Sequence, residues 1–350
     1  MPINKKLWRN SASLIILAKN ACKLDVPNYR LAVLKRPATM SFMPNAVVFP
    51  GGTCEKADES HDWLEHFREC GVSERKMSEV TEVKGPRPDI FRTLGNSPMK
   101  REISLRITAI REAFEELGVL ICRKKNQLED DCDYGSFIEE YDREKWQSMV
   151  DKDPGQFINL CREHELVPDI WKLYEWSAWL TPALIPKRFQ TAFFVVSVEA
   201  QPTIQPCGRE VLSAYWETPP NLLKSFYDKK IDLVMPQIYE LIRFGEYTDI
   251  ENLTKFAKLR NDQGITLQYP TVYNCADGFL HVYPGDDLYP KNPDKNEVDY
   301  DVQQFKNRTF AELRATSNKM HRCEQYSSHN TILILNFELP NGHISPIAKL

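Results

Sequence analysis

One segment of this chain, residues 100–118, combines a helical apolar pattern with a concentration of acidic side chains. Its apolar residues recur at intervals of four, three, four and three, at Ile103, Ile107, Ile110, Phe114 and Leu117. That spacing predicts a helix with one apolar stripe, which must pack against another element. Gly118 suits the left-handed position that commonly ends a helix. The fold must therefore provide a buried partner for this helix.

Three carboxylates lie on the face of this helix away from the stripe. Glu112, Glu115 and Glu116 are spaced at i, i+3 and i+4, which brings them together on a helical surface. Three negative charges this close repel one another unless a cation lies among them. A divalent cation prefers several oxygen ligands, so the three glutamates are candidate metal ligands. The alternative, a solvated acidic face, explains the charges but not the neighbouring Arg111 and Gly118.

A glycine turn lies upstream of the helix. Residues 46–49 have the pattern of a short buried strand, and Pro50, Gly51 and Gly52 follow it directly. Glycine adopts backbone angles that other residues cannot, and it leaves the peptide groups open to a ligand. The turn is therefore a candidate ligand-binding element.

Composition narrows the class of protein. The net charge of −4 lacks the clustered basic excess of nucleic-acid-binding domains, so nucleic acid is an unlikely partner. No stretch approaches the roughly 18 consecutive apolar residues of a membrane span, so we expect no membrane insertion. The nine cysteines are odd in number and lack CxxC spacing, which argues against both a disulfide framework and a zinc site.

The order of apolar and helical patterns predicts a layered α/β fold. Residues 59–100 are polar, with a helical pattern only around 62–70, and we interpret them as an insertion. We expect the following strands and helices in the main part of the chain: strands at 13–18, 30–35, 46–49, 119–122, 175–180, 191–198 and 211–216, and helices at 100–118, 221–227 and 236–244.

Two further regions are less regular. Residues 125–172 are acidic and then aromatic, and we interpret them as a helical insert with helices at 137–150 and 154–164. Residues 246–350 form a C-terminal extension. Its expected elements are strands at 272–273, 279–283 and 331–339 and a helix at 308–319.

These residues resemble the Nudix hydrolase family, whose box is written G-x5-E-x7-R-E-U-x-E-E-x-G-U, with U a bulky apolar residue. Gly52 supplies the first glycine, and Asp58 falls at the first acidic position. Residues 111–118 match the second half, and Val119 is the closing apolar residue. Two departures are that the first acid is Asp rather than Glu, and that Ala113 is a small version of U.

The two halves of this box are far apart in the chain. The spacer, residues 59–110, has 52 residues where the family pattern has seven. Because the insertion makes the alignment of Asp58 uncertain, Glu55 and Glu59 compete with it for the first acidic position.

A spacer of this length resembles one branch of the family, the peroxisomal coenzyme A diphosphatases. Residues 36–52 and 179–182 also resemble that branch. The likeness implies a Nudix hydrolase domain over residues 10–245, folded as an α/β/α sandwich with a mixed sheet. It implies hydrolysis of coenzyme A and acyl-CoA at the diphosphate with Mg²⁺ or Mn²⁺, giving 3′,5′-ADP and 4′-phosphopantetheine or its acyl form.

The resemblance also implies roles for individual residues. Glu112, Glu115 and Glu116 would be the metal ligands, and Arg111 would orient Glu112. Glu112, Glu115 and Arg111 are therefore candidate catalytic residues. The general base is either a box glutamate or an acid from a distant loop, for which Glu210 is the candidate.

Substrate recognition needs a different set of residues. Coenzyme A carries a diphosphate and a 3′-phosphate, so a basic patch is expected, with Lys35, Arg36, Lys187 and Arg188 as its possible contributors. Each basic residue is more often simply a solvated charge. The candidate substrate-binding residues are Gly51, Gly52, Arg36, Lys187 and Arg188.

Two alternative functions remain open at this point. One is a Nudix hydrolase acting on another substrate, such as NADH or capped RNA. The other is a Nudix-fold binding protein without catalysis, which would typically lack one or more box glutamates. A substrate panel distinguishes these possibilities.

The chain ends in Ala348, Lys349 and Leu350. This tripeptide is similar to Ser-Lys-Leu, which a receptor reads as a peroxisomal address. We therefore expect peroxisomal localisation, with the import receptor as a partner.

Overall fold

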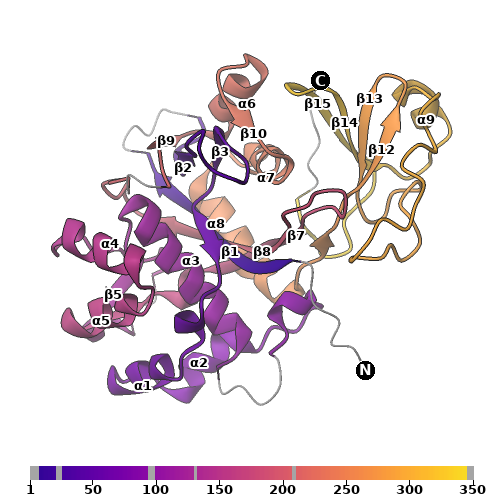
Figure 1. Cartoon of the computed structure of the whole chain (residues 1–350). Helices are drawn as coiled ribbons and strands as arrows, with labels where there is room; N and C mark the ends of the chain where they lie inside the picture. Colours follow the sequence, from indigo (N-terminus) through magenta and orange to yellow (C-terminus); the bar gives the residue numbers. More distant parts are fainter. Residues whose placement is uncertain (1–7, 21–25, 94–98, 130–131, 207–209, 345–350) are drawn as a thin grey trace.

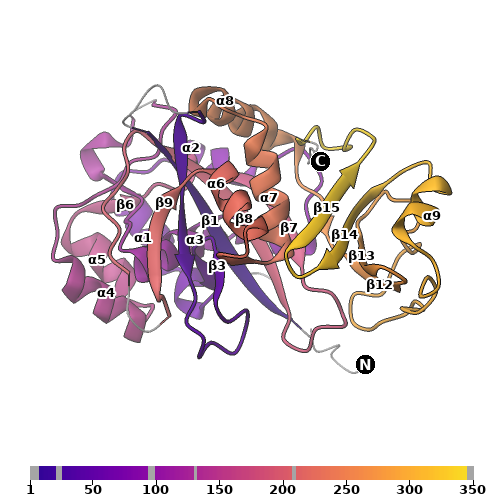
Figure 2. The same cartoon turned by 90° about the horizontal axis from the view of Figure 1, so that it is seen from above.

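The computed structural model describes residues 8–20, 26–93, 99–129, 132–206 and 210–344. It shows a central mixed sheet with helices packed on both faces, and a separate antiparallel sheet built from C-terminal residues (Figures 1 and 2). This is the mixed α/β architecture expected from the order of elements. In the described part of the chain, no helix is both long enough and apolar enough to span a membrane.

The central sheet has nine strands in the described residues. Along the sheet the order is β10-β3-β2-β1-β8-β7-β11, while β4 pairs with β1 and β9 pairs with β2. β1 runs parallel to β8 and antiparallel to β2 and β4. The strands are β1 (Arg9–Lys19), β2 (Tyr29–Lys35), β3 (Ala46–Val48), β4 (Gly51–Thr53), β7 (Tyr174–Leu180), β8 (Phe189–Val198), β9 (Ser213–Glu217), β10 (Asp232–Leu233) and β11 (Leu267–Gln268).

Strand β1 lies at the centre of the fold because both of its faces are buried. Leu14 and Ile16 pack into one apolar core, and Ile15 and Leu17 pack into the other. Successive side chains of a strand point to opposite faces, so a strand between two helical layers is apolar at every position. The continuous apolar run of this segment is the sequence signature of that placement.

The expected acidic helix is present as α3 (Arg101–Leu117), and it ends where predicted. Gly118 follows it with φ 66°, in the left-handed region, and its N–H bonds to the carbonyl of Phe114. The expectation of a single buried stripe was wrong, because 15 of the 17 residues of α3 are buried. The 3₁₀ turn η1 (Lys56–Glu59) and the helix at Arg143–Lys152 (α4) also contact α3, on faces that the sheet does not cover.

The insertion has more helix than the sequence suggested. The pattern near residues 62–70 forms α1 (Asp62–Glu69), but α2 (Glu74–Thr81) and the short η2 (Asp89–Phe91) were not expected. α2 begins at the N-cap Ser73, whose hydroxyl accepts from the N–H of Lys76. An N-cap serine is a sequence signal for the start of a helix, so Ser73 could have predicted α2.

The second insert contains the two expected helices. α4 (Arg143–Lys152) begins later than the predicted residue 137, and α5 (Gln156–Glu163) matches its prediction closely. The strand expected at 119–122 lies slightly later. Around the helices are the paired strands β5 (Cys122–Lys124) and β6 (Leu166–Pro168) and the 3₁₀ turns η3 (Lys125–Gln127) and η4 (Ile170–Lys172).

Three helices follow the last long strands of the sheet. α6 (Pro219–Tyr227) and α7 (Met235–Gly245) were expected, whereas α8 (Ile250–Arg260) and the turn η5 (Asn261–Gln263) were not. α8 packs into the same core as β1, through Ile250, Leu253 and Ala257. The domain boundary expected after residue 245 stays a prediction.

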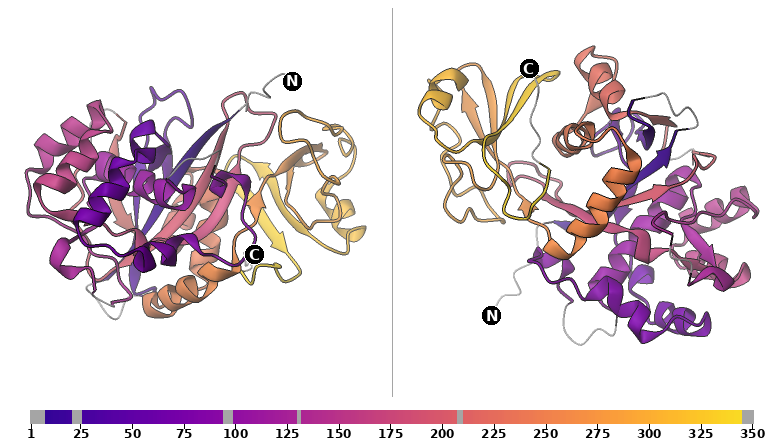
Figure 3. Two further views of the ribbon diagram at one scale, coloured as in Figure 1. Left: turned by 90° about the horizontal axis from the view of Figure 1, so that it is seen from below. Right: turned by 180° about the vertical axis from the view of Figure 1, so that it is seen from behind.

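The remaining C-terminal residues form a four-stranded antiparallel sheet with one short helix. It lies beside α7 (Figure 2), and the views from below and behind show its yellow and orange strands at one end of the molecule (Figure 3). The Tyr239 hydroxyl bonds to Nε2 of His321 across the contact with α7 at 2.7 Å. The helix expected at 308–319 is shorter, and β14 was not predicted. The elements are β12 (Thr271–Cys275), β13 (Gly278–Val282), α9 (Phe310–Ala315), β14 (His321–Ser327) and β15 (Asn330–Leu335).

Candidate active site

The glycine segment expected as a turn forms strand β4, and it meets the acidic helix α3 in the folded chain. The backbone N–H of Gly51 donates to Oε2 of Glu116 at 2.8 Å. Gly51 is paired in register with Ser13 of β1, whose hydroxyl donates to the carbonyl of Pro50 at 2.8 Å. A Cβ on Gly51 would lie 2.5 Å from the backbone oxygen of Ala12, so only glycine fits there. The core strand thus fixes β4 against the helix.

Gly52, the second glycine of the segment, lies close to the side chain of Glu112. A Cβ on this residue would lie 2.5 Å from the carboxylate carbon of Glu112. The absence of a side chain therefore creates the space that the Glu112 carboxylate occupies. The structure brings the predicted residues Gly51, Gly52, Glu112 and Glu116 together.

Alanine at position 52 is expected to move the Glu112 carboxylate. Since displacements of about 1 Å in a catalytic group reduce rates by up to roughly a hundredfold, kcat should fall at least about tenfold in the Gly52→Ala variant. Steady-state hydrolysis measurements check this. Gly245→Ala is the matched control, because a Cβ there meets nothing within 4 Å. Equal activity of the two variants would contradict the assigned geometry.

Arg111 joins the two halves of the box through Asp58. Its Nε donates to Oδ1 of Asp58 at 2.8 Å and its Nη2 donates to Oδ2 at 2.9 Å. Both side chains are 1% exposed. Asp58 also accepts from the Thr108 hydroxyl and from the N–H of Glu55. Glu59 instead forms an ion pair with Arg101. Of the three competing acids, Asp58 therefore pairs with the box arginine.

The same guanidinium reaches the glutamates. Arg111 Nη1 donates to Oε1 of Glu115 at 2.8 Å and lies 3.0 Å from Oε1 of Glu112. Its Nη2 also donates to the carbonyl of Thr53, the residue after the glycine pair. Arg111 thus fixes the positions of two carboxylates and is itself fixed by Asp58. Thr53 and Thr108 were not singled out in the sequence, since a hydroxyl or carbonyl partner has no motif of its own.

Burial raises the pKa of all three glutamates of the box, Glu112, Glu115 and Glu116. It raises the pKa of Glu112 to about 8 and that of Glu115 to about 7, against the opposing charge of Arg111. Burial and the charge of Glu112 raise the pKa of Glu116 well above its ordinary value. Closely spaced, desolvated carboxylates of this kind are stabilised in their charged form by a cation. Their oxygen chemistry fits a hard divalent ion.

The glutamates nevertheless point toward protein partners in this structure. Glu115 accepts from Arg111, and Glu116 accepts from Gly51. Among the described residues, no three His, Cys, Asp or Glu side chains are grouped as a ready metal site. The assignment of Glu112, Glu115 and Glu116 as metal ligands therefore stays a prediction, supported by burial and by donor chemistry.

Two other predicted residues lie close enough for their charges to act on Glu116. The charge of Arg36 lowers the pKa of Glu116 and that of Glu210 raises it, although burial and Glu112 have the larger effects. The loop carrying Glu210 is held beside Arg36, because the N–H of Leu212 donates to the carbonyl of Lys35 at 2.8 Å. Glu210 is exposed. Its role as the general base stays a prediction.

The structure separates the other two basic candidates. Lys187 Nζ donates to the Ser41 hydroxyl at 2.9 Å, on a loop that Arg36 contacts through the carbonyl of Phe42. Arg188 is buried, and its Nε donates to the carbonyl of Thr181. Its guanidinium lies near the rings of Trp8 and Tyr269, and burial lowers its pKa. Lys187 therefore shares a surface with Arg36, whereas Arg188 sits in a different environment.

Comparison with known proteins decides the family. The NUDT19 Nudix domain model matches residues 8–244, and the NUDT19 C-terminal domain model matches residues 272–336. The chain belongs to the Nudix hydrolase family. Nudix hydrolases generally act with a divalent metal ion, which agrees with the buried glutamates of the Nudix box described above.

Similarity to relatives extends over nearly the whole chain. Acyl-coenzyme A diphosphatase NUDT19 of Xenopus laevis is 33% identical, covering 98% of this chain and 96% of the relative. The Homo sapiens protein of the same name is 31% identical, covering 97% and 94%. A crystal structure of a NUDIX hydrolase from Alicyclobacillus acidocaldarius has a TM-score of 0.53 and 21% identity, covering 71% of this chain and 96% of that chain. It shows the same fold.

Proposed function

We propose that this chain hydrolyses the diphosphate bond of coenzyme A and acyl-CoA, giving 3′,5′-ADP and 4′-phosphopantetheine or its acyl form. The observation that carries the proposal is the joining of the two halves of the Nudix box across the long insertion, by the Gly51–Glu116 and Asp58–Arg111 contacts. The full-length likeness to acyl-coenzyme A diphosphatases supports the choice of substrate.

The roles follow from the chemistry of a diphosphate. Glu112, Glu115 and Glu116 would hold Mg²⁺ or Mn²⁺, which neutralises phosphate charge and lowers the pKa of water when bound. Arg111 fixes the orientation of Glu112 and Glu115 through the contacts described above. Glu210 is the proposed general base, since it is exposed and its charge acts on Glu116.

Basic side chains beside the site would bind the phosphate groups of coenzyme A. Arg36 is half-buried next to the glutamates, and Lys187 extends the same surface through its contact with Ser41. Arg36 and Lys187 are therefore the proposed contacts to the diphosphate and the 3′-phosphate. Arg188 is the weaker candidate because its guanidinium is buried.

Metal binding and stability should depend on pH in opposite directions. The raised pKa values of Glu112 and Glu115 mean that, between about pH 4.5 and 8, the metal-free folded state binds protons that the unfolded state lacks. Its stability therefore falls as pH rises through this window. Mg²⁺ competes with those protons, so its stabilising effect grows with pH. We expect Mg²⁺ to raise the melting temperature by roughly 3 °C or more at pH 8 and by under about 1 °C at pH 5.

Thermal unfolding with and without MgCl₂, at constant ionic strength, measures both effects. Glu144→Gln, an exposed change on α4, serves as the control and should follow the unaltered protein. An equal stabilisation by Mg²⁺ at pH 5 and pH 8 would contradict the glutamate assignment.

A substrate panel tests the proposed activity. Coenzyme A, a series of acyl-CoAs, NADH and capped RNA are each incubated with the full chain and Mg²⁺ or Mn²⁺, and products are identified by mass spectrometry. The proposal expects 3′,5′-ADP from the coenzyme A compounds at the highest kcat/KM. Preferred cleavage of NADH or capped RNA would assign another Nudix activity. Metal binding without any hydrolysis would assign a binding protein.

Peroxisomal import is proposed from the terminal tripeptide alone. Ala348, Lys349 and Leu350 lie outside the described residues, and their likeness to the Ser-Lys-Leu address supports the proposal. A fluorescent protein fused to the N-terminus should reach peroxisomes with the intact chain and stay outside them when Leu350 is deleted. Unchanged import of the truncated chain would overturn the proposal.

A further inference from the structure

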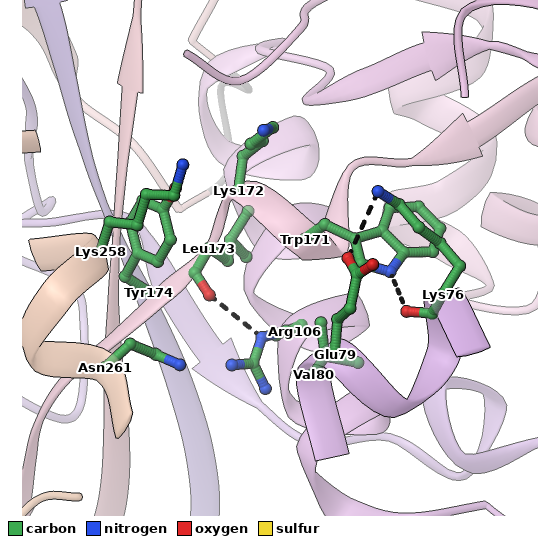
Figure 4. Close-up of a pocket in the computed structure, with 10 residues that line it drawn as sticks. All are labelled: Lys76, Glu79, Val80, Arg106, Trp171, Lys172, Leu173, Tyr174, Lys258 and Asn261. Atoms are coloured by element: carbon green, nitrogen blue, oxygen red, sulfur yellow. Dashed lines mark hydrogen bonds and ion pairs between the residues drawn. The ribbon is translucent and has the colours of Figure 1, made fainter. Parts of the chain in front are cut away.

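A basic cavity lies apart from the Nudix box, between the insertion and the central sheet (Figure 4). Its volume is about 260 Å³, and its walls come from α2, η4, the start of β7 and the end of α8. One lining residue, Arg106, belongs to α3, the helix that carries the glutamates of the Nudix box. It precedes Glu112 by six positions, which separates them by about 9 Å along the helix and about 120° around it. The cavity and the box therefore face different directions.

The lining of this cavity is strongly cationic. Lys76, Arg106, Lys172 and Lys258 contribute four positive charges, against the single carboxylate of Glu79. They come from four elements that the fold brings together, α2, α3, η4 and α8. Like charges converging on a partly enclosed, low-dielectric space repel one another and attract anions. The cavity therefore has the electrostatics of an anion site.

Three of these cations already have partners. Lys76 Nζ lies 3.3 Å from the carboxylate of Glu79, and Lys258 is paired with Asp133. Arg106 donates to the carbonyl of Leu173 at 3.1 Å and is paired with the buried carboxylate of Glu175 at 3.3 Å. These contacts hold the charged groups in place around the space.

Lys172 is different. It is 8% exposed, and within the described part of the chain its ammonium has no hydrogen-bond or ion-pair partner. Burial lowers its pKa, and the nearby Asp169 opposes this, but both oxygens of Asp169 are bonded to Arg123. Figure 4 shows the Lys172 side chain extending beside that of Lys258. Its ammonium is not among the fully buried polar atoms of the described residues that lack a partner, so it is open to the cavity and available to a bound anion.

We propose that this cavity binds a phosphate group, either free phosphate or the phosphate monoester of a nucleotide, with Lys172 as its principal contact. A doubly charged tetrahedral anion matches several converging donors better than a carboxylate does. The volume suits one phosphate with a small attached group, since it lies near the lower end of ligand pockets, roughly 300 Å³. Trp171 provides a ring in the same lining. Because Lys76 belongs to α2, the insertion within the box supplies one wall of this second site.

Calorimetric titration of the full chain tests the inference. Metal-free protein, prepared on a chelating resin so that the box binds no phosphate through a cation, is titrated with inorganic phosphate and separately with AMP. Binding of phosphate alone assigns the free ion, and binding of AMP alone assigns the ester. In either case Lys172→Met should weaken binding by about tenfold or more. Glu116→Gln and Lys84→Met, which alter the box and an exposed lysine outside the lining, should leave it unchanged.

Two results would overturn the proposal. One is the absence of binding by either anion, and the other is an unchanged affinity in the Lys172→Met variant. Should that variant fail to fold, acetylation of the unaltered protein decides the question, with modification of each lysine followed by peptide mass spectrometry. Phosphate should protect Lys172 but not Lys84 relative to chloride at the same ionic strength. Equal modification of Lys172 in both salts would also exclude the site.

Discussion

Glutamine at position 116 is expected to reduce kcat by roughly 100- to 1000-fold while leaving the fold intact. The loss follows because Gln cannot supply the negative charge that a divalent cation requires at this site. The fold survives because the amide oxygen of Gln can still accept the N–H of Gly51, which now bonds to Oε2 of Glu116 at 2.8 Å. Steady-state hydrolysis of coenzyme A with saturating Mg²⁺ measures the effect.

The control for this substitution is Glu144→Gln, which makes the same chemical change on the exposed surface of α4. It should retain the full rate. Circular dichroism and the melting temperature show whether the Glu116→Gln chain remains folded. A folded Glu116→Gln enzyme with a near-normal rate would refute the assignment of this carboxylate to the metal.

Replacement of Arg111 by methionine should give the largest loss of stability. The change leaves Asp58 as a buried charge without its partner, and removal of one member of a buried ion pair typically costs about 3–5 kcal/mol. Both side chains are 1% exposed, so water cannot take the place of the guanidinium. Chemical unfolding followed by tryptophan fluorescence measures the free energy of unfolding.

A second substitution separates the charge effect from the loss of packing. In the Arg111→Met background, Asp58→Asn removes the unpaired charge and should restore at least about 1 kcal/mol. Lys145→Met breaks an exposed pair with Glu163 and should change stability by less than about 0.5 kcal/mol. A destabilisation by Arg111→Met as small as that of Lys145→Met would contradict the role assigned to the Asp58–Arg111 pair.

Local patterns in the sequence predicted the acidic helix of the site and the core strand behind it, but not β4 or η1. The spacing of apolar residues in α3 and the terminal Gly118 fixed that helix to within one residue at each end. The continuous apolar run of β1 likewise predicted a strand. What periodicity could not show was the environment of Glu112 and Glu116, which are buried, with β4 against both carboxylates, rather than solvated. That burial depends on segments distant in sequence.

Strand β14 illustrates a different difficulty. Its buried positions include Arg322 and Glu324, which break the apolar alternation expected of a half-buried strand. Asp286 pairs with Arg322, and Arg314 pairs with Glu324, so the charges are satisfied only after folding. Helix α8 did carry a local signal, the N-cap at Asp249, whose carboxylate accepts from the N–H of Asn252.

The choice among Asp58, Glu55 and Glu59 also required the structure. All three acids lie within five positions and differ little in local pattern. Only the position of the Arg111 guanidinium separates them, because it meets the carboxylate of Asp58 with two hydrogen bonds. The sequence limits the first acid of the box to three candidates, and the contact with Arg111 selects Asp58.

The ion pair between Glu59 and Arg101 closes the base of the insertion, since these two residues lie at its opposite ends. The two ends of the insertion therefore lie next to each other, beside the residues of the box. The helices of the insertion pack Trp63, Phe67 and Val80 into the core that holds α3, so only the connections between those helices are free to change in length, because loop-closure entropy grows only slowly with length. A lineage can lengthen or shorten those connections without disturbing the residues of the box.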